Sequence, residues 1–179
     1  MKRNSLHALL NSYTSADTDE LEMLADIKSF VSANPDCFER SLASGHVTAS
    51  GWVISPARDK VLLMHHRKLD RWFQPGGHCD GDPDVVAVAA KEVEEETGLM
   101  NVKLLQQGIF DVDIHLIPAS SKDAAHNHYD IRLLFEADPS EELVINIESR
   151  EIKWLPIQEI SYLNDSESIM RMVRKTISL

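Results

Sequence analysis

The stretch that decides the fold is residues 77–99, which read GHCDGDPDVVAVAAKEVEEETGL. Asp82 can accept backbone N–H bonds as a helix N-cap, and Pro83 suits the first helical position because its missing N–H is not needed there. Gly98 stands where a helix C-terminal glycine is expected. The stretch therefore predicts a turn followed by a helix over residues 85–97.

Carboxylates gather on one edge of this predicted helix. Glu92, Glu95 and Glu96 share that edge at spacings of three and four, while Glu94 and Lys91 project elsewhere. The three like charges repel by roughly 0.2–0.5 kcal/mol per neighbouring pair, and they lie near the negative end of the helix dipole. A divalent cation with oxygen ligands would remove both penalties, whereas a solvated acidic face is the simpler interpretation. The core-facing stripe is expected to consist of Val86, Ala89, Val93 and Thr97.

The spacing of the whole stretch closely resembles the Nudix box, and the preceding Trp72–His78 segment resembles the family's approach to it. The resemblance covers about residues 45–165. Two positions depart from the pattern: Pro83 replaces a glutamate, and Lys91 replaces an arginine and so lacks its bidentate guanidinium. In the family these two positions mainly brace the loop against the helix. Their loss therefore bears on rate and loop rigidity more than on metal binding.

The resemblance implies a fold, an activity and a metal site. The fold is an α/β class, Nudix-like α/β/α sandwich with a mixed β-sheet over residues 46–179. The activity is metal-dependent hydrolysis of the diphosphate linkage of a nucleoside diphosphate joined to another group. The alternative is a Nudix-fold nucleotide-binding or regulatory module with weak or lost catalysis. The implied ion is Mg²⁺ or Mn²⁺, and its ligands would be the carbonyl of Gly77 and the catalytic carboxylates of Glu92, Glu95 and Glu96.

A further catalytic carboxylate is expected from outside the box. Glu148 and Glu151 precede Trp154 in a loop-like stretch, and Glu151 is assigned as a catalytic residue. A structural salt bridge is the competing interpretation of Glu151.

The rest of the chain alternates between helical and strand patterns. Residues 1–45 have helical periodicity, and Asp17 and Glu20 have the spacing of a capping box. Packing against the main domain is the default role of this N-terminal helical segment, with a lid or a homodimer contact as alternatives. A closing helix is predicted over 165–177. Strands are predicted over 46–55, 61–66, 102–107, 109–116, 129–137 and 152–155.

Two of these strands carry polar side chains at alternate positions, which places each set on one strand face. The two sets are Asp111, Asp113 and His115, and His126, His128 and Asp130. They would share a face if the strands pair as a hairpin. A substrate-binding wall and the wet side of a sheet are equally favoured, and a dedicated second metal site is less favoured than either. His78, His126 and His128 are assigned to substrate binding, as is Trp72, for which packing beneath the loop is the alternative.

Composition bounds the class of protein. The 179 residues carry 18 basic and 29 acidic side chains, a net charge of −11 that excludes nucleic-acid polymers as partners. Small phosphorylated substrates stay compatible, because a bound cation reverses the local field. Neither a membrane span nor a signal peptide is expected. The only two cysteines, Cys37 and Cys79, make no disulfide framework and indicate the cytoplasm.

Overall fold

The computed structural model describes residues 2–120, 124–147 and 149–179. Its helices are α1 (Asn4–Ser12), α2 (Thr18–Ala33), α3 (Val85–Thr97), the 3₁₀ turn η1 (Ile157–Glu159), α4 (Ile160–Leu163) and α5 (Glu167–Ile177). Its strands are β1 (Gly45–Ile54), β2 (Lys60–His66), β3 (Arg71–Phe73), β4 (Gly76–His78), β5 (Lys103–Leu104), β6 (Asp111–Ile117), β7 (His126–Glu136) and β8 (Ser149–Pro156). Within these ranges, no helix is both long and apolar enough to cross a membrane.

All eight strands belong to one mixed sheet, with β1 at its centre. The main order is β3-β2-β1-β7-β5, and β4, β6 and β8 pair with β1, β7 and β2, respectively. β1 and β7 run parallel over their whole length, from Gly45 opposite Asn127 to Ile54 opposite Glu136, whereas the other pairs are antiparallel. Both β2 and β4 use the other edge of β1, β2 near its end and β4 near its middle.

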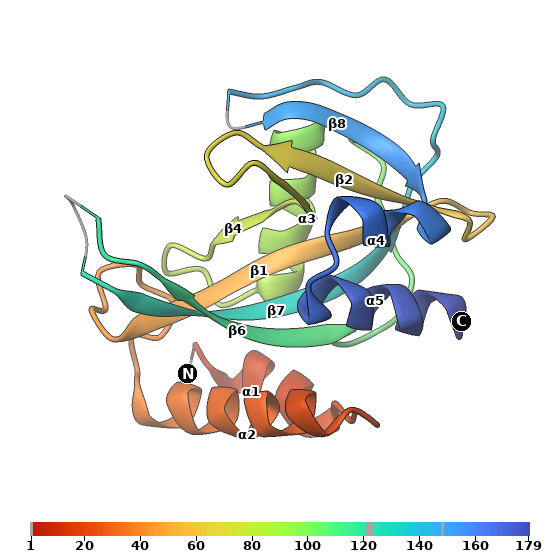
Figure 1. Ribbon diagram of the computed structural model, residues 1–179. Coiled ribbons are helices and arrows are strands. Elements are labelled where there is room, and N and C mark those ends of the chain that lie inside the picture. Colours follow the sequence, from red (N-terminus) through yellow and green to blue (C-terminus); the bar gives the residue numbers. More distant parts are fainter. Residues whose placement is uncertain (1, 121–123, 148) are drawn as a thin grey trace.

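Helices cover both faces of this sheet, which confirms the predicted α/β/α sandwich (Figure 1). On one face α3 packs closely, since a Cβ placed on Gly51 would lie 2.4 Å from Cγ2 of Val93. On the other face the indole N–H of Trp52 donates to Thr176 Oγ1 of α5 at 2.8 Å. Because Gly51 and Trp52 are neighbours in β1, their side-chain positions point to opposite faces.

The N-terminal helices pack onto the main domain, as the default interpretation expected. Leu6 and Leu10 of α1 are fully buried in the same core as Val93. The ring of Phe30 in α2 stacks on Tyr129 of β7 with centroids 3.8 Å apart. Asp17 caps α2 by accepting from the backbone N–H of Glu20. Residues that precede the Nudix-like region therefore complete its core.

The structure corrects several predicted boundaries. The strand predicted over 102–107 contains only β5 (Lys103–Leu104). Residues 67–82, for which the sequence predicts no strand, contain β3 and β4. β7 begins at His126, three positions before the predicted start at Tyr129. Polar side chains hid this start, because they occupy positions where the sequence pattern shows no apolar alternation.

Helix α3 has the predicted bounds but a different N-cap residue. Asp84, not Asp82, is the N-cap, and its carboxylate accepts from the N–H of Ala87 at 3.1 Å. Asp82 instead accepts from the N–H of Asp84, so Pro83 lies within a turn and outside the helix. Of the predicted stripe, Ala89, Val93 and Thr97 are buried and Val86 is only partly buried. The full set of buried residues in α3 is Val85, Val88, Ala89, Val93, Glu96 and Thr97. Gly98 ends the helix with φ of 80°, the left-handed conformation that glycine adopts readily.

Candidate active site

Strand β4 and helix α3 bring two glutamates against a pair of glycines. The backbone N–H of Gly76 donates to Glu96 Oε2 at 2.8 Å. A Cβ placed on Gly77 would lie 2.5 Å from Glu92 Oε2, so only glycine lets this carboxylate lie so close to the backbone. Glu96 is 8% exposed although it is an acid. The arrangement thus places two carboxylates beside one stretch of polar backbone.

The third glutamate of the set lies farther out. Glu95 has a side chain that is 54% exposed, and its carboxylate pairs with Lys91 Nζ at 3.1 Å. The expectation that Lys91 projects from a different edge is therefore wrong, since the two residues are one helical turn apart and meet. Lys91 offsets part of the repulsion between the glutamates.

These residues fit a hard divalent cation. Carboxylate and carbonyl oxygens are the ligands that Mg²⁺ accepts in proteins. Gly77 provides the space that a side chain would fill, and Glu92 occupies it. A partly buried pair of carboxylates close to one backbone segment is an arrangement that a bound cation would stabilise.

A second cluster consists of histidines on the sheet itself. The ring of His46 on β1 lies 5.0 Å from His78 of β4, 5.0 Å from His126 and 4.8 Å from His128 of β7, by ring centroids. His115 of β6 is 5.3 Å from His128. The three predicted substrate-binding histidines, His78, His126 and His128, therefore do lie together.

His46 was missed by the sequence reasoning. It precedes the apolar run of β1, and only the parallel pairing of β1 with β7 places it directly opposite His128. That pairing joins segments about eighty residues apart, and a single sequence gives no signal for it. β6 and β7 do pair antiparallel, which was the condition for the two polar sets to share a face. In this pairing Asp113 lies opposite Asp130 and His115 lies opposite His128.

The histidine cluster lies on the face of β1 that is turned away from α3. His46, Thr48 and Ser50 alternate with Val47, Ala49 and Gly51, and Gly51 is the position that contacts α3. His126 and His128 therefore do not face the helix that carries the glutamates. The side chains alternate along β7 as they do along β1, so its histidines share the face of His46.

Two of these histidines are held in the neutral form. Burial lowers the pKa of His46 to about 4, with a further contribution from His78 and His126. Burial also lowers the pKa of His128 to about 3, assisted by His115 and His78. Near pH 7 both rings are uncharged and each offers a nitrogen lone pair.

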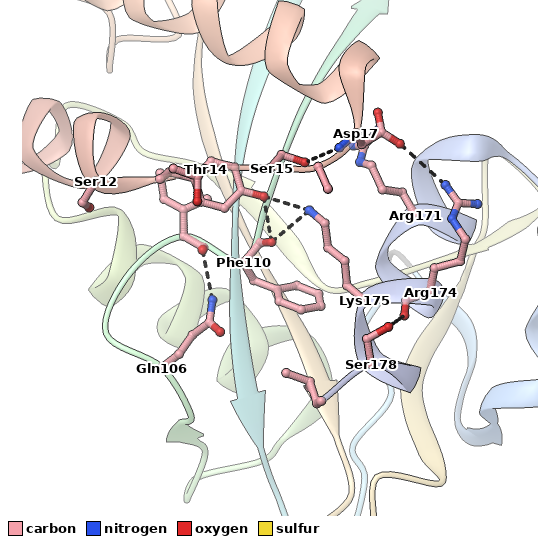
Figure 2. A pocket seen from close by; sticks show the side chains of 14 residues that line it. Ser12, Thr14, Ser15, Asp17, Gln106, Phe110, Arg171, Arg174, Lys175 and Ser178 are labelled. Atoms are coloured by element: carbon pink, nitrogen blue, oxygen red, sulfur yellow. Dashed lines mark hydrogen bonds and ion pairs between the residues drawn. The ribbon is translucent and has the colours of Figure 1, made fainter.

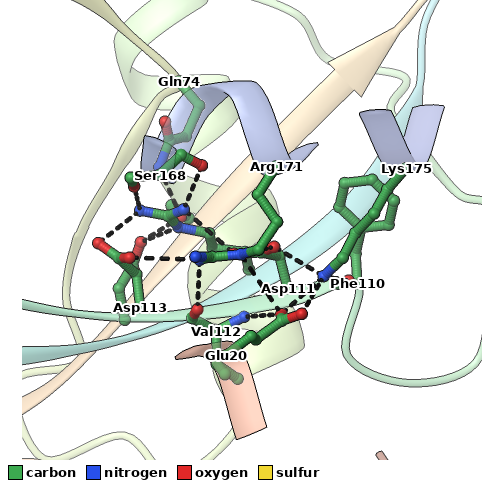
Figure 3. A network of polar contacts seen from close by, with 12 residues as sticks. Glu20, Gln74, Phe110, Asp111, Val112, Asp113, Ser168, Arg171 and Lys175 are labelled. Carbon is green, nitrogen blue, oxygen red and sulfur yellow. Dashed lines mark hydrogen bonds and ion pairs between the residues drawn. The ribbon is translucent and has the colours of Figure 1, made fainter. Parts of the chain in front are cut away.

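The aspartates of the two polar strands are used in a buried ionic network, not in a substrate wall (Figure 3). Arg132 bonds Asp111, Asp113 and Asp130 through side chains that are almost fully buried. Arg171 of α5 donates to Asp111 and Asp113. Burial opposes ionisation of both acids, but the arginines outweigh it and hold the pKa of Asp111 and Asp113 below its usual range.

This network also holds the N-terminal helices. Glu20 of α2 is fully buried, and its carboxylate accepts from Lys175 Nζ of α5 at 2.6 Å and from the N–H of Val112 at 3.0 Å. Tyr13 donates its hydroxyl to the same carboxylate at 2.6 Å. Glu20 thus takes a structural role that its position in a capping box did not reveal.

The remaining predicted site residues have structural contacts. Trp72 is buried and its ring stacks on His65 at 5.2 Å, which is the packing alternative. Glu151 forms an ion pair with Lys153 on β8, which is the salt-bridge alternative. Glu148 lies outside the described residues.

A pocket of about 530 Å³ with a mixed polar and apolar lining opens between the α1–α2 connection, the segment before β6, and α5 (Figure 2). Arg174 and Lys175 line it, together with Tyr13, Asp17 and Phe110. Its fourteen lining residues include none of the glutamates of α3 and none of the clustered histidines, so this pocket is distinct from both clusters.

Comparison with known proteins identifies the family. The model of the NUDIX domain family matches residues 45–175. This match covers well over half of the chain, and the chain therefore belongs to the Nudix family.

Two curated relatives share moderate identity with the chain. The nucleoside diphosphate-linked moiety X motif 6 protein of Xenopus laevis is 26% identical over 140 residues, which are 75% of this chain and 61% of the relative. The CMP-5'-(N-acetyl-N-hydroxy-3-aminopropyl)phosphonate hydrolase of Streptomyces rubellomurinus is 29% identical over 122 residues, 62% of this chain and 52% of the relative. The chain thus spans less than two thirds of either protein.

Solved structures share the fold. A C. elegans Ap4A hydrolase in a binary complex superposes with a TM-score of 0.60 at 16% identity, covering 74% of this chain and 95% of that one. The E. coli dihydroneopterin triphosphate pyrophosphohydrolase gives a TM-score of 0.57 at 16% identity, covering 74% and 96%. At this level of identity, the likeness concerns the fold alone.

Proposed function

We propose that this protein is a metal-dependent pyrophosphohydrolase that cleaves the diphosphate linkage of a nucleoside diphosphate joined to another group. The observation that carries the proposal is the placement of Glu92 and Glu96 against Gly76 and Gly77, within a chain of the Nudix family. The names of both curated relatives also refer to a nucleotide joined to a further moiety, which favours this substrate class.

The protein's part in the reaction is to hold the metal ion and to position its carboxylate ligands. Glu92, Glu95 and Glu96, with the carbonyl of Gly77, would hold Mg²⁺ or Mn²⁺. When bound, the ion supplies charge stabilisation for the diphosphate and activation of water. The N–H of Gly76 orients the carboxylate of Glu96, and Lys91 holds Glu95. Phosphoryl transfer depends mainly on such positioning and charge stabilisation, so this machinery suffices for the chemistry.

The two departures from the Nudix box are compatible with catalysis. Pro83 lies in the turn before α3, and Asp82 and Asp84 provide the local hydrogen bonds that fix this turn. Lys91 keeps a positive charge beside Glu95. The glutamates next to β4 are retained, which supports an enzyme over a binding module that has lost catalysis.

The test is turnover of a panel of nucleoside diphosphate derivatives with Mg²⁺, followed by anion-exchange chromatography of the products. We expect Glu96→Gln to abolish hydrolysis while the fold is kept. Glu94→Gln is the matched control, because Glu94 is exposed on the same helix and should leave turnover unchanged. Full activity in Glu96→Gln, or in the wild type with EDTA, would disprove the proposal. Tight nucleotide binding without turnover would favour the regulatory module instead.

We place this activity in the cytoplasm and expect no nucleic-acid polymer as a partner. Cys37 and Cys79 are both free and buried, as a reducing compartment permits. Burial raises the pKa of Cys37 to about 11, which keeps this thiol protonated and unreactive. Association into a homodimer stays a proposal that light scattering can test.

A further inference from the structure

Three histidine side chains from three different strands converge at one point on the sheet face turned away from α3. His46, His78 and His128 each offer one ring nitrogen, and these three atoms all lie within 4.8 Å of one another. We propose that they form a second metal centre, which binds a transition-metal ion of the Zn²⁺ class and is separate from the carboxylate site.

The backbone fixes this triad. His46 of β1 lies directly opposite His128 of β7 in a parallel ladder, and His78 of β4 lies opposite Thr48 on the other edge of β1. Because side chains two apart share a strand face, His78 points to the same face as His46. The three ligands are therefore held by hydrogen-bonded strands, so the backbone already positions them before an ion binds.

Nitrogen atoms of two of these histidines, His46 and His128, are buried without a hydrogen bond. Within the described part of the chain, neither ring nitrogen of His46 has one, although His46 is only 2% exposed. Nε2 of His128 is also buried without a hydrogen bond. Buried polar atoms are nearly always paired, and such exceptions require an explanation. An ion at the centre of the triad would bind one nitrogen of each ring.

The ligand set selects the kind of ion. Imidazole nitrogens suit Zn²⁺ and its first-row neighbours, whereas Mg²⁺ prefers oxygen ligands. Tetrahedral bonds of about 2.1 Å separate ligand nitrogens by about 3.4 Å, so small side-chain rotations would bring the triad to bonding distance. Three histidines leave a fourth position for water or for His126, whose ring is 5.0 Å from that of His46.

The surroundings favour a cation over a phosphate group. Asp113 lies 3.5 Å from His115 Nδ1, and Asp130 follows His128 on the same face of β7. Both acids also pair with Arg132, and the chain as a whole carries a charge of −11, which disfavours an added anion.

The experiment measures metal binding directly, without turnover. The full chain, stripped with a chelator and dialysed, is titrated with Zn²⁺ in competition with a chromophoric chelator, and with Co²⁺ as a spectroscopic substitute. We expect one tight equivalent of Zn²⁺ and the intense visible bands of a four-coordinate cobalt centre. His78→Asn and His128→Asn should each weaken binding by about 100-fold or more, since even residues that only orient ligands change affinity by about 10–100-fold.

Two controls separate this site from the proposed active site. His7→Asn, on α1 and outside the cluster, should bind as the wild type does. Glu92→Gln combined with Glu96→Gln should keep the tight equivalent while losing hydrolysis, so failure of one proposal does not affect the other. Circular dichroism and thermal melting of each apo variant show that it is folded before titration.

Three results would overturn the proposal. The first is Zn²⁺ binding by the wild type that is no tighter than binding by His78→Asn and His128→Asn. The second is evidence that the ion is bound outside the histidine triad: loss of the tight equivalent in the glutamate variant alone, or the weak cobalt bands of a six-coordinate ion. The third is binding of inorganic phosphate, measured by calorimetry, that depends on the same histidines in the absence of metal.

Discussion

Replacing Arg171 with methionine tests the buried ionic network most directly. The guanidinium of Arg171 donates to Asp111 Oδ2 and Oδ1 at 2.8 Å each, to the carbonyl of Val112 at 2.7 Å and to Asp113 at 3.3 Å. Its side chain is 4% exposed, and that of Asp111 is fully buried. Methionine fills similar space but leaves the aspartates with fewer cations.

The size of the effect follows from this burial. Removing one partner of a buried ion pair costs about 3–5 kcal/mol, because the remaining charge is left poorly compensated in a low dielectric. For a chain of this length, such a loss lowers the melting temperature by about 6–20 °C. Lys175 and Arg132 still contact Asp111, and they keep the cost within this range.

The assay is urea denaturation at pH 7 with Arg174→Met as the matched control. Arg174 lies one turn further along α5, but its side chain is 52% exposed and pairs with exposed Glu167. We expect this control to change the free energy of unfolding by less than about 0.5 kcal/mol. A loss below about 1 kcal/mol in Arg171→Met, or equal losses in both variants, would refute the reasoning.

The remaining predictions concern pH and the site. Asp111 has a lowered pKa in the folded state, so the stability that its ionised carboxylate contributes is fully present above the unfolded pKa of about 3.9. This stability is lost as the pH falls through the lower pKa of the folded state. The difference in the free energy of unfolding between wild type and Arg171→Met should therefore narrow below about pH 4. Gly77→Ala should reduce turnover sharply in a steady-state assay, because the added Cβ collides with Glu92. Pro83→Glu with Lys91→Arg should retain or raise turnover with an unchanged melting temperature; a loss of turnover would show that the site has adapted to its own residues.

Local signals made helix α3 predictable from the sequence. The acidic residues before it, the apolar stripe within it and Gly98 after it all act over a few residues, and both ends of the helix are as predicted. The predicted N-cap residue was wrong for an equally local reason. Asp82 and Asp84 both suit an N-cap, and the sequence alone favoured Asp82, which precedes Pro83. The fixed spacing of the Nudix box also predicted the fold of the whole domain, which local helix and strand propensities do not reveal.

Contacts between distant segments could not be predicted in this way. His46 joins the histidine cluster only because β1 runs parallel to β7, and Glu20 is buried only because α2 meets α5. Parallel strands are not joined by a short turn, so their pairing leaves no local signal in the sequence, unlike the antiparallel pairing of β6 and β7. Alternation groups side chains on one strand face without saying which helix covers that face, so the sequence could not place the polar face of β6 and β7 relative to α3.

Strand β4 shows why the glutamates and the histidines form two sites and not one. In a strand, successive side-chain positions point to opposite faces. Gly77 is turned toward Glu92 on the face of α3, and the next residue, His78, is turned toward His46 on the other face. An ion bound by Glu92 therefore lies across the strand from one bound by His78, and a single shared ion is excluded by the backbone between them. Oxygen ligands on one face and imidazole nitrogens on the other would also sort different metals to the two sites.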